Sequence, residues 1–420
     1  MNYFIETIGC QMNICESDKL GHALSCYGIL KANVLQKADI VILNTCSVRD
    51  QAEQKAFSFL GRAEEFKREK PNIKIVVVGC MAERIEHKIK HRFKSVNLII
   101  GAKDIDNAAF KIADLCDISN YSIAERESDK AFDIIKYITV MRGCDNYCSY
   151  CVVPFVRGQE TSFKSSDIIE DCRLAVNNGA KEIMLLGQNV NSYKYDDIKF
   201  TDLVKNIAKI DGLERIRFMT NHPKDLSNEL IDMMAREPKV CSHIHLPMQS
   251  ASNNILLAMN RKYTYQQYLM LIKKLRVAVP DISVTTDIIV GFPGETEEDF
   301  EQTLKAVKEI RFGGLYVFRY SSRPNTRAAS MDDDVPLEDK KKRHSIILKE
   351  SNKISIEIVA SMVGTTQQVL AEKIEGDVIE TRTRSGRKVF VKCASKKDLG
   401  KQLNVSIKEA KINSLFGEII

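Results

Sequence analysis

The chain has 420 residues and a formal net charge of +6, with 44% hydrophobic and 28% charged residues. This is the composition of a folded globular protein, and a prior of roughly 150 residues per domain predicts two or three domains. It contains no apolar run of the roughly 18 residues that a membrane span needs, which argues against an integral membrane protein.

The N-terminus lacks the basic start and apolar stretch of a signal peptide, so we expect a cytoplasmic protein with no membrane partner. Twelve cysteines in 420 residues are too sparse for a disulfide scaffold. In a reducing compartment, clustered thiols more often indicate metal or redox chemistry.

The first hundred residues alternate short apolar runs with polar segments of helical length, such as 50–70. The runs are YFIETIG, ADIVILNTC, IKIVVVGC and NLIIG. This pattern predicts a parallel α/β sheet covered on both faces, and we assign residues 1–118 to this domain. The polar stretch DISNYSIAERESDKAF that follows is interpreted as a linker.

Cys10, Cys46 and Cys80 end the first three runs of this domain. The carboxyl ends of strands form the ligand-binding edge of an open α/β sheet, so three cysteines far apart in sequence are expected to converge there. Buried packing cysteines are the alternative that this pattern alone leaves open.

Residues 134–335 contain six further apolar runs, each followed by a polar or glycine-containing segment. The runs are IKYITVM, EIMLLG, RIRFMT, HIHLPM, SVTTDIIV and GLYVFRY. A strand and helix repeated six times predicts a partial (βα)6 barrel similar to a TIM barrel, which has eight such units. All the polar ends are expected on the face where barrel enzymes carry their chemistry.

Residues 336–358 are predicted to form a linking helix, and residues 359–420 contain five short alternating segments typical of a small β-barrel. This last part carries eleven basic and seven acidic residues, or +4 of the total charge. Basic side chains of this kind bind phosphates without reading sequence. The candidates for contact with the phosphates of an oligonucleotide are Arg382, Arg384, Arg387 and Lys388, followed by Lys392, Lys396 and Lys397.

RGCDNYCSYC places Cys144, Cys148 and Cys151 at spacings of four and three residues. Three thiolates in one loop can bind three corners of a 4Fe-4S cubane and leave one iron open for a substrate or cofactor. A zinc site would need a fourth ligand, and the nearest histidines, His91 and His222, are far away in sequence.

This loop, with Tyr150 before its last cysteine, resembles the signature of radical S-adenosylmethionine enzymes. The resemblance implies that Cys144, Cys148 and Cys151 are catalytic cluster ligands, and that the open iron chelates S-adenosylmethionine. Cleavage of this cofactor by the reduced cluster would give a 5′-deoxyadenosyl radical. The residues expected at the cofactor are Tyr150, Gln188 of LLGQNVNSY, and Gly291, Pro293 and Gly294 of GFPGE.

The three domains together resemble the radical S-adenosylmethionine methylthiotransferase family over nearly the whole chain. The resemblance implies a second 4Fe-4S cluster on Cys10, Cys46 and Cys80, associated with sulfur delivery, and an RNA-binding TRAM domain, an OB-like barrel, at the C-terminus. The motifs NTCSVRDQAEQK, LLGQNVNSY and YSSRPNTRAA look most like the branch of this family that modifies isopentenyladenosine in tRNA.

In that branch, N6-isopentenyladenosine next to the anticodon becomes its 2-methylthio derivative. Carbon 2 of adenine carries an unactivated hydrogen that a carbon radical can remove and a protein base cannot. The expected partners are the tRNA anticodon loop, an electron donor and a sulfur source, and the expected state is a monomer. Arg157 and Phe155 are candidates for contact with the unstacked loop.

Two alternatives remain open at this point. One is a methylthiotransferase that acts on threonylcarbamoyladenosine in tRNA or on an aspartate of a ribosomal protein. The other is an iron–sulfur protein that binds RNA without turnover, for which an open iron would have no use.

Overall fold

The computed structural model describes residues 1–47, 50–119, 133–392, 396–412 and 414–420. The chain divides into two compact units. Unit 1 comprises Met1–Ala131, Arg142–Asp145 and Val152–Thr161, and unit 2 comprises Phe132–Met141, Asn146–Cys151 and Ser162–Ile420. Most of the predicted linker lies outside the described residues. The finer division into four domains stays a prediction.

Unit 1 is built on a five-stranded parallel sheet with the strand order β2-β1-β3-β4-β5. Its strands are β1 (Asn2–Ile8), β2 (Leu30–Lys31), β3 (Ile40–Thr45), β4 (Lys74–Gly79) and β5 (Leu98–Gly101). Its helices are α1 (Gln11–Ser25), α2 (Asp50–Glu69), α3 (Cys80–Arg92), α4 (Ala108–Leu115) and the short α5 (Val153–Arg157).

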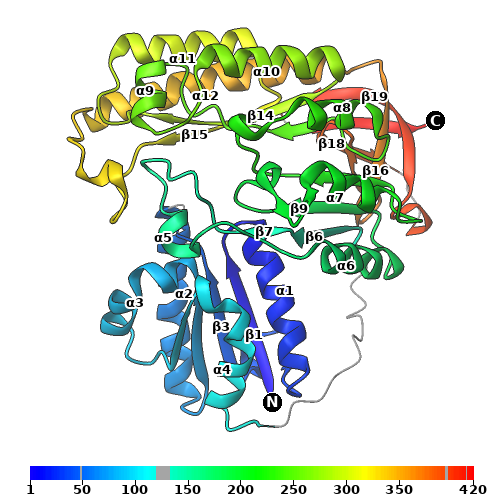
Figure 1. Ribbon diagram of the computed structural model, residues 1–420. Helices are drawn as coiled ribbons and strands as arrows, with labels where there is room; N and C mark the ends of the chain where they lie inside the picture. The colour runs from blue at the N-terminus through cyan, green and yellow to red at the C-terminus, as the bar shows by residue number, and fades with distance from the viewer. Residues whose placement is uncertain (48–49, 120–132, 393–395, 413) are drawn as a thin grey trace. The chain divides into compact units, whose positions relative to one another are not determined.

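Alternate residues of the central strands pack into two separate cores, because successive side chains point to opposite faces of a sheet. Val41 and Leu43 of β3 pack with α2 and α3, whereas Ile40 and Ile42 pack with α1 and α4. Figure 1 shows these helices around the sheet. The predicted α/β sheet with two covered faces is confirmed.

Unit 2 begins with six parallel strands arranged as two three-stranded sheets, β12-β9-β6 and β13-β14-β15. A single parallel bridge pairs Ile216 of the first sheet with Val240, which lies just before the first strand of the second sheet. The strands are β6 (Ile135–Thr139), β9 (Glu182–Leu186), β12 (Arg215–Phe218), β13 (His243–His245), β14 (Ser283–Val290) and β15 (Gly314–Arg319). All six predicted runs form strands, as a partial barrel requires.

Helices pack against these strands through one large apolar core. They are α6 (Ser165–Asn177), α7 (Phe200–Ala208), α8 (Asn228–Arg236), α9 (Asn253–Ala258), α10 (Tyr265–Ala278), α11 (Glu297–Ile310) and the long α12 (Leu337–Ala360). Figure 1 shows α10, α11 and α12 along one side of β14 and β15. The shorter strands are β7 (Met141–Arg142), β8 (Thr161–Ser162), β10 (Lys194–Tyr195) and β11 (Ile198–Lys199).

The C-terminal strands close into a barrel with the order β16-β17-β18-β20-β19. They are β16 (Thr366–Glu375), β17 (Val378–Thr383), β18 (Lys388–Lys392), β19 (Gln402–Lys411) and β20 (Ser414–Ile419). Closure leaves no unpaired sheet edge. The predicted small β-barrel is confirmed, and α12 covers the residues predicted to form the linking helix before it.

Candidate active site and metal centres

The strand register of unit 1 places Cys10, Cys46 and Cys80 along one sheet edge. Ile8 of β1 pairs with Thr45 of β3, which pairs with Gly79 of β4. Cys46 and Cys80 follow these positions directly, and Cys10 follows two residues after Ile8. Neighbouring strands lie about 4.8 Å apart, so the register brings together cysteines that are distant in sequence.

The three thiols differ in their surroundings. Cys10 is exposed, and Cys46 and Cys80 are buried. A hydrogen bond from Cys46, with the positive charge of Arg157, lowers the pKa of Cys10 to about 6. Burial raises the pKa of Cys80 to about 11, although Arg157 opposes this effect. The set therefore includes one thiol that ionises readily near neutral pH.

Arg157 of α5 is the closest charged neighbour of Cys80. Its Nε donates a hydrogen bond to the Cys80 sulfur at 3.1 Å, and its two terminal nitrogens donate to the Glu16 carboxylate at 2.6 and 3.1 Å. Only 6% of Arg157 is exposed, and 5% of Glu16. This burial weighs against contact of Arg157 with RNA, because each of its guanidinium nitrogens donates to an acceptor inside unit 1, and the RNA contact stays a prediction. Phe155 of the same helix is exposed.

Two buried asparagines, which sequence reasoning missed, support the chain around Cys10. Asn13 Oδ1 accepts hydrogen bonds from the Cys10 backbone at 3.2 Å and from its thiol at 3.3 Å. Asn44 Nδ2 donates to the Asn13 carbonyl and to Ser17. The signal for both was the polar residue beside each cysteine in CQMN and NTC, where an apolar core residue would be expected.

The second cysteine set spans the unit boundary in sequence, with Cys144 in unit 1 and Cys148 and Cys151 in unit 2. In unit 1, the Cys144 amide donates to the Gly158 carbonyl at 3.3 Å. Gly143 has a φ of +78°, and a Cβ there would lie 2.0 Å from the Gln159 carbonyl oxygen. Only glycine fits this turn before Cys144.

In unit 2, the loop that carries Cys148 and Cys151 is anchored on the end of α9. Ser149 donates its amide to the Met259 carbonyl and its hydroxyl to the Ala258 carbonyl, at 3.0 and 2.7 Å. Arg261, only 4% exposed, donates Nη1 to the Cys148 sulfur at 3.3 Å. Arg261 was not predicted, because it lies 113 residues from its partner.

Among the described residues, no three His, Cys, Asp or Glu side chains meet closely enough to hold a single metal ion. A cubane differs from a single ion, because each cysteine binds a separate iron and the sulfurs surround the cluster. Both sets offer the donors that such a cluster needs: thiols at strand ends in the first set and in a hydrogen-bonded loop in the second, with a guanidinium N–H beside one sulfur in each set. Hydrogen bonds to the sulfurs are a known way to stabilise and tune clusters.

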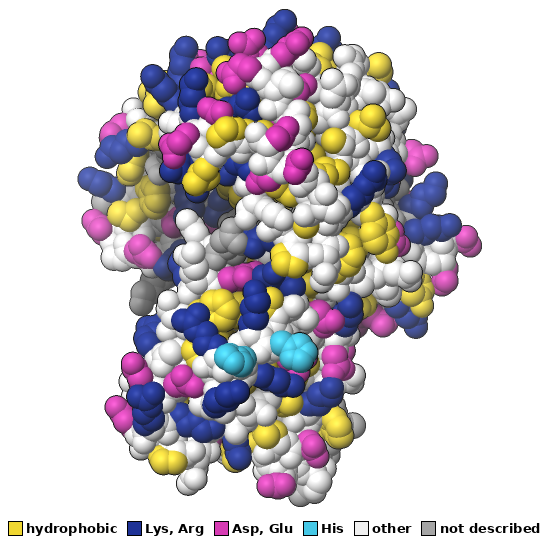
Figure 2. Space-filling view, turned by 90° about the vertical axis from the view of Figure 1, so that its left-hand side faces the viewer, with side chains coloured by type: hydrophobic (Ala, Val, Ile, Leu, Met, Phe, Trp, Pro, Cys, Tyr) yellow, Lys and Arg dark blue, Asp and Glu magenta, His cyan; other side chains and the backbone are white. Residues whose placement is uncertain are grey.

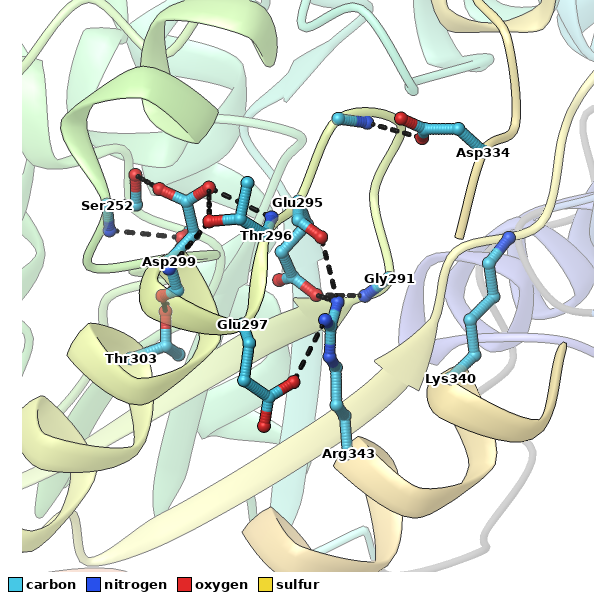
Figure 3. Close-up of polar contacts among 12 residues, drawn as sticks. Ser252, Gly291, Glu295, Thr296, Glu297, Asp299, Thr303, Asp334, Lys340 and Arg343 are labelled. Atoms are coloured by element: carbon cyan, nitrogen blue, oxygen red, sulfur yellow. Dashed lines mark hydrogen bonds and ion pairs between the residues drawn. The ribbon is translucent and has the colours of Figure 1, made fainter. Parts of the chain in front are cut away.

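The GFPGE loop follows β14, and polar contacts within the loop and to nearby residues fix its shape (Figure 3). The Gly291 amide donates to Glu295 Oε2 at 2.6 Å, and Arg343 of α12 donates to the same oxygen at 2.8 Å. Gly291 has a φ of +67°, and a Cβ there would lie 2.3 Å from Cγ of Lys340. The Gly294 amide donates to Asp334 at 2.8 Å. These glycines shape the loop, and their amides are already engaged by carboxylates.

Tyr150 and this loop share one apolar cluster. Phe292 of the loop packs with Tyr320, Met259 and Ile255, and Tyr150 lies against them. Burial raises the pKa of Tyr150. Pro293 is buried, whereas Gln188, which follows β9, is half-buried. The structure thus brings Tyr150 together with Phe292 of GFPGE, while the roles of Gln188, Gly291, Pro293 and Gly294 at a cofactor stay predictions.

Two of the arginines proposed for RNA contact, Arg384 and Arg387, fasten the C-terminal barrel to the core of unit 2, and the third, Arg382, forms an ion pair inside the barrel. Arg384 donates to the Val240 carbonyl at 2.6 Å, and Arg387 donates to Gly313 and Ser355. Arg382 pairs with Glu372. These protein contacts weigh against phosphate binding by the three guanidiniums, and the predicted RNA contact of these arginines stays a prediction. Lys388, Lys392 and Lys397 are exposed, and the side chain of Lys396 lies outside the described residues.

Comparison with known proteins matches three sequence families along the chain. The match described as uncharacterized protein family UPF0004 covers residues 2–101, the Radical SAM superfamily covers 138–307, and the TRAM domain covers 360–420. A tRNA-2-methylthio-N(6)-dimethylallyladenosine synthase from Endomicrobium trichonymphae is 67% identical over 420 residues, all of both chains. The chain belongs to the tRNA-2-methylthio-N(6)-dimethylallyladenosine synthase family. The synthase from Clostridium novyi is 42% identical, and the match covers all of this chain and 96% of that protein.

Two solved structures have a fold similar to that of this protein. A radical S-adenosylmethionine methyltransferase, TsrM, from Kitasatospora setae matches with a TM-score of 0.61 at 12% identity, over 89% of this chain and 79% of that one. The cobalamin-dependent S-adenosylmethionine radical enzyme OxsB matches with a TM-score of 0.54 at 11% identity, over 84% and 57% of the two chains. The predicted family is confirmed, and so is the radical S-adenosylmethionine core. In the described residues, no helix is long and apolar enough to cross a membrane.

Proposed function

We propose that this protein is a radical S-adenosylmethionine methylthiotransferase that converts N6-isopentenyladenosine in tRNA to its 2-methylthio derivative. The observation that carries this proposal is the likeness to named synthases over the full chain, which includes both cysteine sets and the barrel. The names of these relatives favour the isopentenyl (dimethylallyl) branch over the threonylcarbamoyladenosine and ribosomal-protein alternatives. A family that turns over substrate also disfavours a purely binding protein.

Cys144, Cys148 and Cys151 would hold the cluster that binds S-adenosylmethionine, and Cys10, Cys46 and Cys80 would hold a second one. When bound, the first cluster and its cofactor supply a carbon radical able to take hydrogen from carbon 2 of adenine, and the second serves sulfur delivery. Arg261 and Arg157 donate N–H groups to one sulfur in each set. A donor at a thiolate offsets its negative charge in the low dielectric of a buried site.

The residues of the GFPGE loop would position the cofactor without binding it through the Gly291 and Gly294 amides. Arg343 of α12 fixes the loop through Glu295, and Phe292 and Tyr150 exclude water at its apolar side. A rigid loop keeps the reacting atoms in register, which contributes to rate by orientation. The electron donor and the sulfur source are separate partners that complete the reaction.

The test is nucleoside analysis after anaerobic reaction of the reconstituted protein with S-adenosylmethionine, sulfide, a reductant and tRNA that carries isopentenyladenosine. The wild type is expected to form the 2-methylthio product. Cys148→Ala is expected to lose both cofactor cleavage and product, whereas Cys80→Ala is expected to keep cofactor cleavage and lose product. Cys172→Ala, at a buried cysteine outside both sets, is the matched control and is expected to keep both.

Each outcome separates one part of the proposal from the rest. If the cofactor is cleaved while isopentenyladenosine stays unmodified, the radical core stands and the substrate assignment fails. If Cys80→Ala still forms product at the wild-type rate, the second cluster has no role in sulfur delivery.

A further inference from the structure

One face of the β13-β14-β15 sheet carries a polar cluster that the cysteine sites do not explain. Along β14, Val284, Ile288 and Val290 point into the helix-covered core, so the intervening residues lie on the opposite face. Asp287 is therefore on the face away from α10, α11 and α12. Its side chain is 26% exposed.

A chain of side-chain contacts fixes the Asp287 carboxylate. Thr285 Oγ1 lies 3.2 Å from His243 Nε2 and 3.0 Å from His245 Nδ1. His245 Nε2 lies 3.4 Å from Asp287 Oδ2, and the His245 side chain is only 6% exposed. The buried imidazole thus orients one carboxylate oxygen. Among the described residues, the other oxygen accepts no hydrogen bond.

Tyr316 lies directly across from Asp287 on the neighbouring strand β15. It is 52% exposed, and its ring stands at 66° to the His245 ring with centroids 6.1 Å apart. The exposed ring offers a flat apolar surface on which another aromatic ring can stack. An aromatic ring beside a fixed hydrogen-bond acceptor is the chemistry that recognises an unstacked base.

We propose that Asp287, oriented by His245, accepts the N6–H of the substrate adenine, and that Tyr316 stacks on its ring. This inference rests on the proposed function. N6-isopentenyladenosine keeps one N–H at N6, and in the six-membered ring N1 separates carbon 2 from the carbon that bears N6, so a contact at N6 leaves the C2–H edge open. A carboxylate oxygen can take this N–H, and its pairing with His245 keeps it in place.

S-adenosylmethionine also contains an adenine, so either the cofactor adenine or the substrate adenine could donate an N–H to Asp287. Asp287 lies three residues before Val290, the last residue of β14, which is about 10 Å at 3.3 Å per residue. Tyr150 and the GFPGE loop, predicted for the cofactor, follow the strand ends. A position this far along the strand favours the substrate adenine over the cofactor adenine.

The experiment is a double-mutant cycle in which one change is made in the protein and the other in the RNA. It uses full-length reconstituted protein. The two RNAs are anticodon stem-loops whose adenosine carries an N6-isopentenyl group or both N6-isopentenyl and N6-methyl groups, so that only the first has an N6–H. For the wild type, we expect kcat/KM and affinity to fall about tenfold to a hundredfold without this N–H, as for a hydrogen bond to a charged group. For Asp287→Ala, we expect kcat/KM and affinity to differ less than about threefold between the two RNAs.

Ser283→Ala is the matched control, because Ser283 lies four residues earlier on the same face of β14. It is expected to keep the wild-type preference for the N6–H. Tyr316→Phe is expected to bind both RNAs like the wild type, and Tyr316→Ala is expected to bind both about fivefold to a hundredfold more weakly, as for the loss of base stacking.

Three results would overturn the inference: equal discrimination by Asp287→Ala and the wild type, loss of discrimination in Ser283→Ala, or a weaker affinity of Asp287→Ala for S-adenosylmethionine alone. The last result would assign the carboxylate to the cofactor adenine. If the wild type cleaves S-adenosylmethionine but modifies neither RNA, the proposed function fails. The affinities of the two RNAs then still test Asp287.

Discussion

Arg157 and Arg261 both donate an N–H to a cysteine sulfur, but different groups balance their charges. Arg157 is paired with the buried Glu16 carboxylate. The other contacts of Arg261 are the Tyr263 hydroxyl at 3.1 Å and the Pro247 carbonyl at 3.0 Å, and burial keeps Tyr263 neutral by raising its pKa. Among the described residues, no carboxylate pairs with Arg261. A buried cation without a carboxylate favours an anionic partner, which a cluster thiolate at Cys148 would provide.

The Arg157–Glu16 pair leads to a prediction about stability. Arg157→Met leaves Glu16 buried without its main partner, which we expect to destabilise unit 1 by about 3 kcal/mol. This is at the lower end of the range, because Arg142 Nε remains 4.0 Å from Glu16. Adding Glu16→Gln removes the unpaired charge and should recover most of the loss. Urea unfolding of the metal-free protein measures both effects.

Lys103→Ala is the control for this prediction. It removes an exposed pair with Glu83 at 3.3 Å and should cost no more than about 1 kcal/mol. A double variant as unstable as Arg157→Met would show that the loss comes from packing of the arginine side chain and not from the unpaired carboxylate.

At the scale of one element, the start of α11 holds the end of the GFPGE loop. The Asp299 amide donates to Thr296 Oγ1 at 3.2 Å, and Asp299 Oδ2 accepts from the Thr296 amide at 3.0 Å, which forms a capping box. Ser252 donates to the other Asp299 oxygen at 2.5 Å. The cap therefore joins the helix start to the loop before α9 (Figure 3).

Thr296→Ala is predicted to cost about 1 kcal/mol, as for the loss of a helix cap. It should also weaken S-adenosylmethionine binding, because the last residues of the loop lose their anchor. Thr264→Ala removes a similar capping box from α10, and it should cost a similar stability while leaving the cofactor affinity unchanged. Urea unfolding and equilibrium binding measure the two quantities. Equal affinities for both variants would contradict a positioning role for the loop.

Asp299 also predicts a pH dependence. Burial raises the pKa of Asp299, but the hydrogen bonds from Ser252 and Thr296 outweigh burial and leave the pKa below its ordinary value. A carboxyl with a lowered folded pKa stabilises the protein above its unfolded pKa, near 4, and loses this effect as the pH falls through the folded value. The difference in unfolding free energy between wild type and Asp299→Asn should thus be full at pH 7 and shrink below about pH 4. A difference that grows on acidification would contradict this assignment.

The elements were predictable from sequence to the extent that their signals were local. Strand ends follow from apolar runs, and parallel pairing puts such ends on one edge, so the convergence of Cys10, Cys46 and Cys80 was expected. Arg157 could be expected beside a cluster from its charge, but its partner Cys80 was not predictable, because the two residues are 77 positions apart. For the same reason, the protein acceptors of the barrel arginines could not be predicted. Charge is visible in a sequence, but the acceptor that neutralises it is not.

At the scale of the whole molecule, the sign of the net charge does not by itself locate the RNA surface. Figure 2 shows Lys and Arg interleaved with Asp and Glu over one face. In unit 2, arginines serve the junction of barrel and core from both sides: Arg215 and Arg217 of β12 donate to the carbonyls of Arg382 and Arg384, at 2.7 and 3.1 Å. The exposed lysines of the barrel are then the better candidates for phosphate contact.

This distinction gives a prediction for tRNA binding. Replacing Lys388, Lys392 and Lys397 by alanine should weaken tRNA affinity, and the slope of log affinity against log salt should fall by about one for each phosphate that the protein no longer neutralises. Arg384→Ala should loosen the barrel and lower the unfolding midpoint, while the salt slope stays unchanged, because its guanidinium donates to the Val240 carbonyl. Filter binding at several salt concentrations measures affinity and slope together.

The charge-matched control replaces three exposed lysines on the core helices, Lys273 of α10 and Lys305 and Lys308 of α11. It removes the same charge from unit 2, so a general effect of net charge would change both triple variants equally. A reduced slope only in the barrel variant would place the phosphate backbone on the barrel lysines. The Glu380 carboxylate pairs with Lys388, so Glu380→Gln gives the opposite test. It frees this lysine for RNA, and the affinity for tRNA should rise at low salt. A lower affinity would show that Lys388 does not contact the RNA.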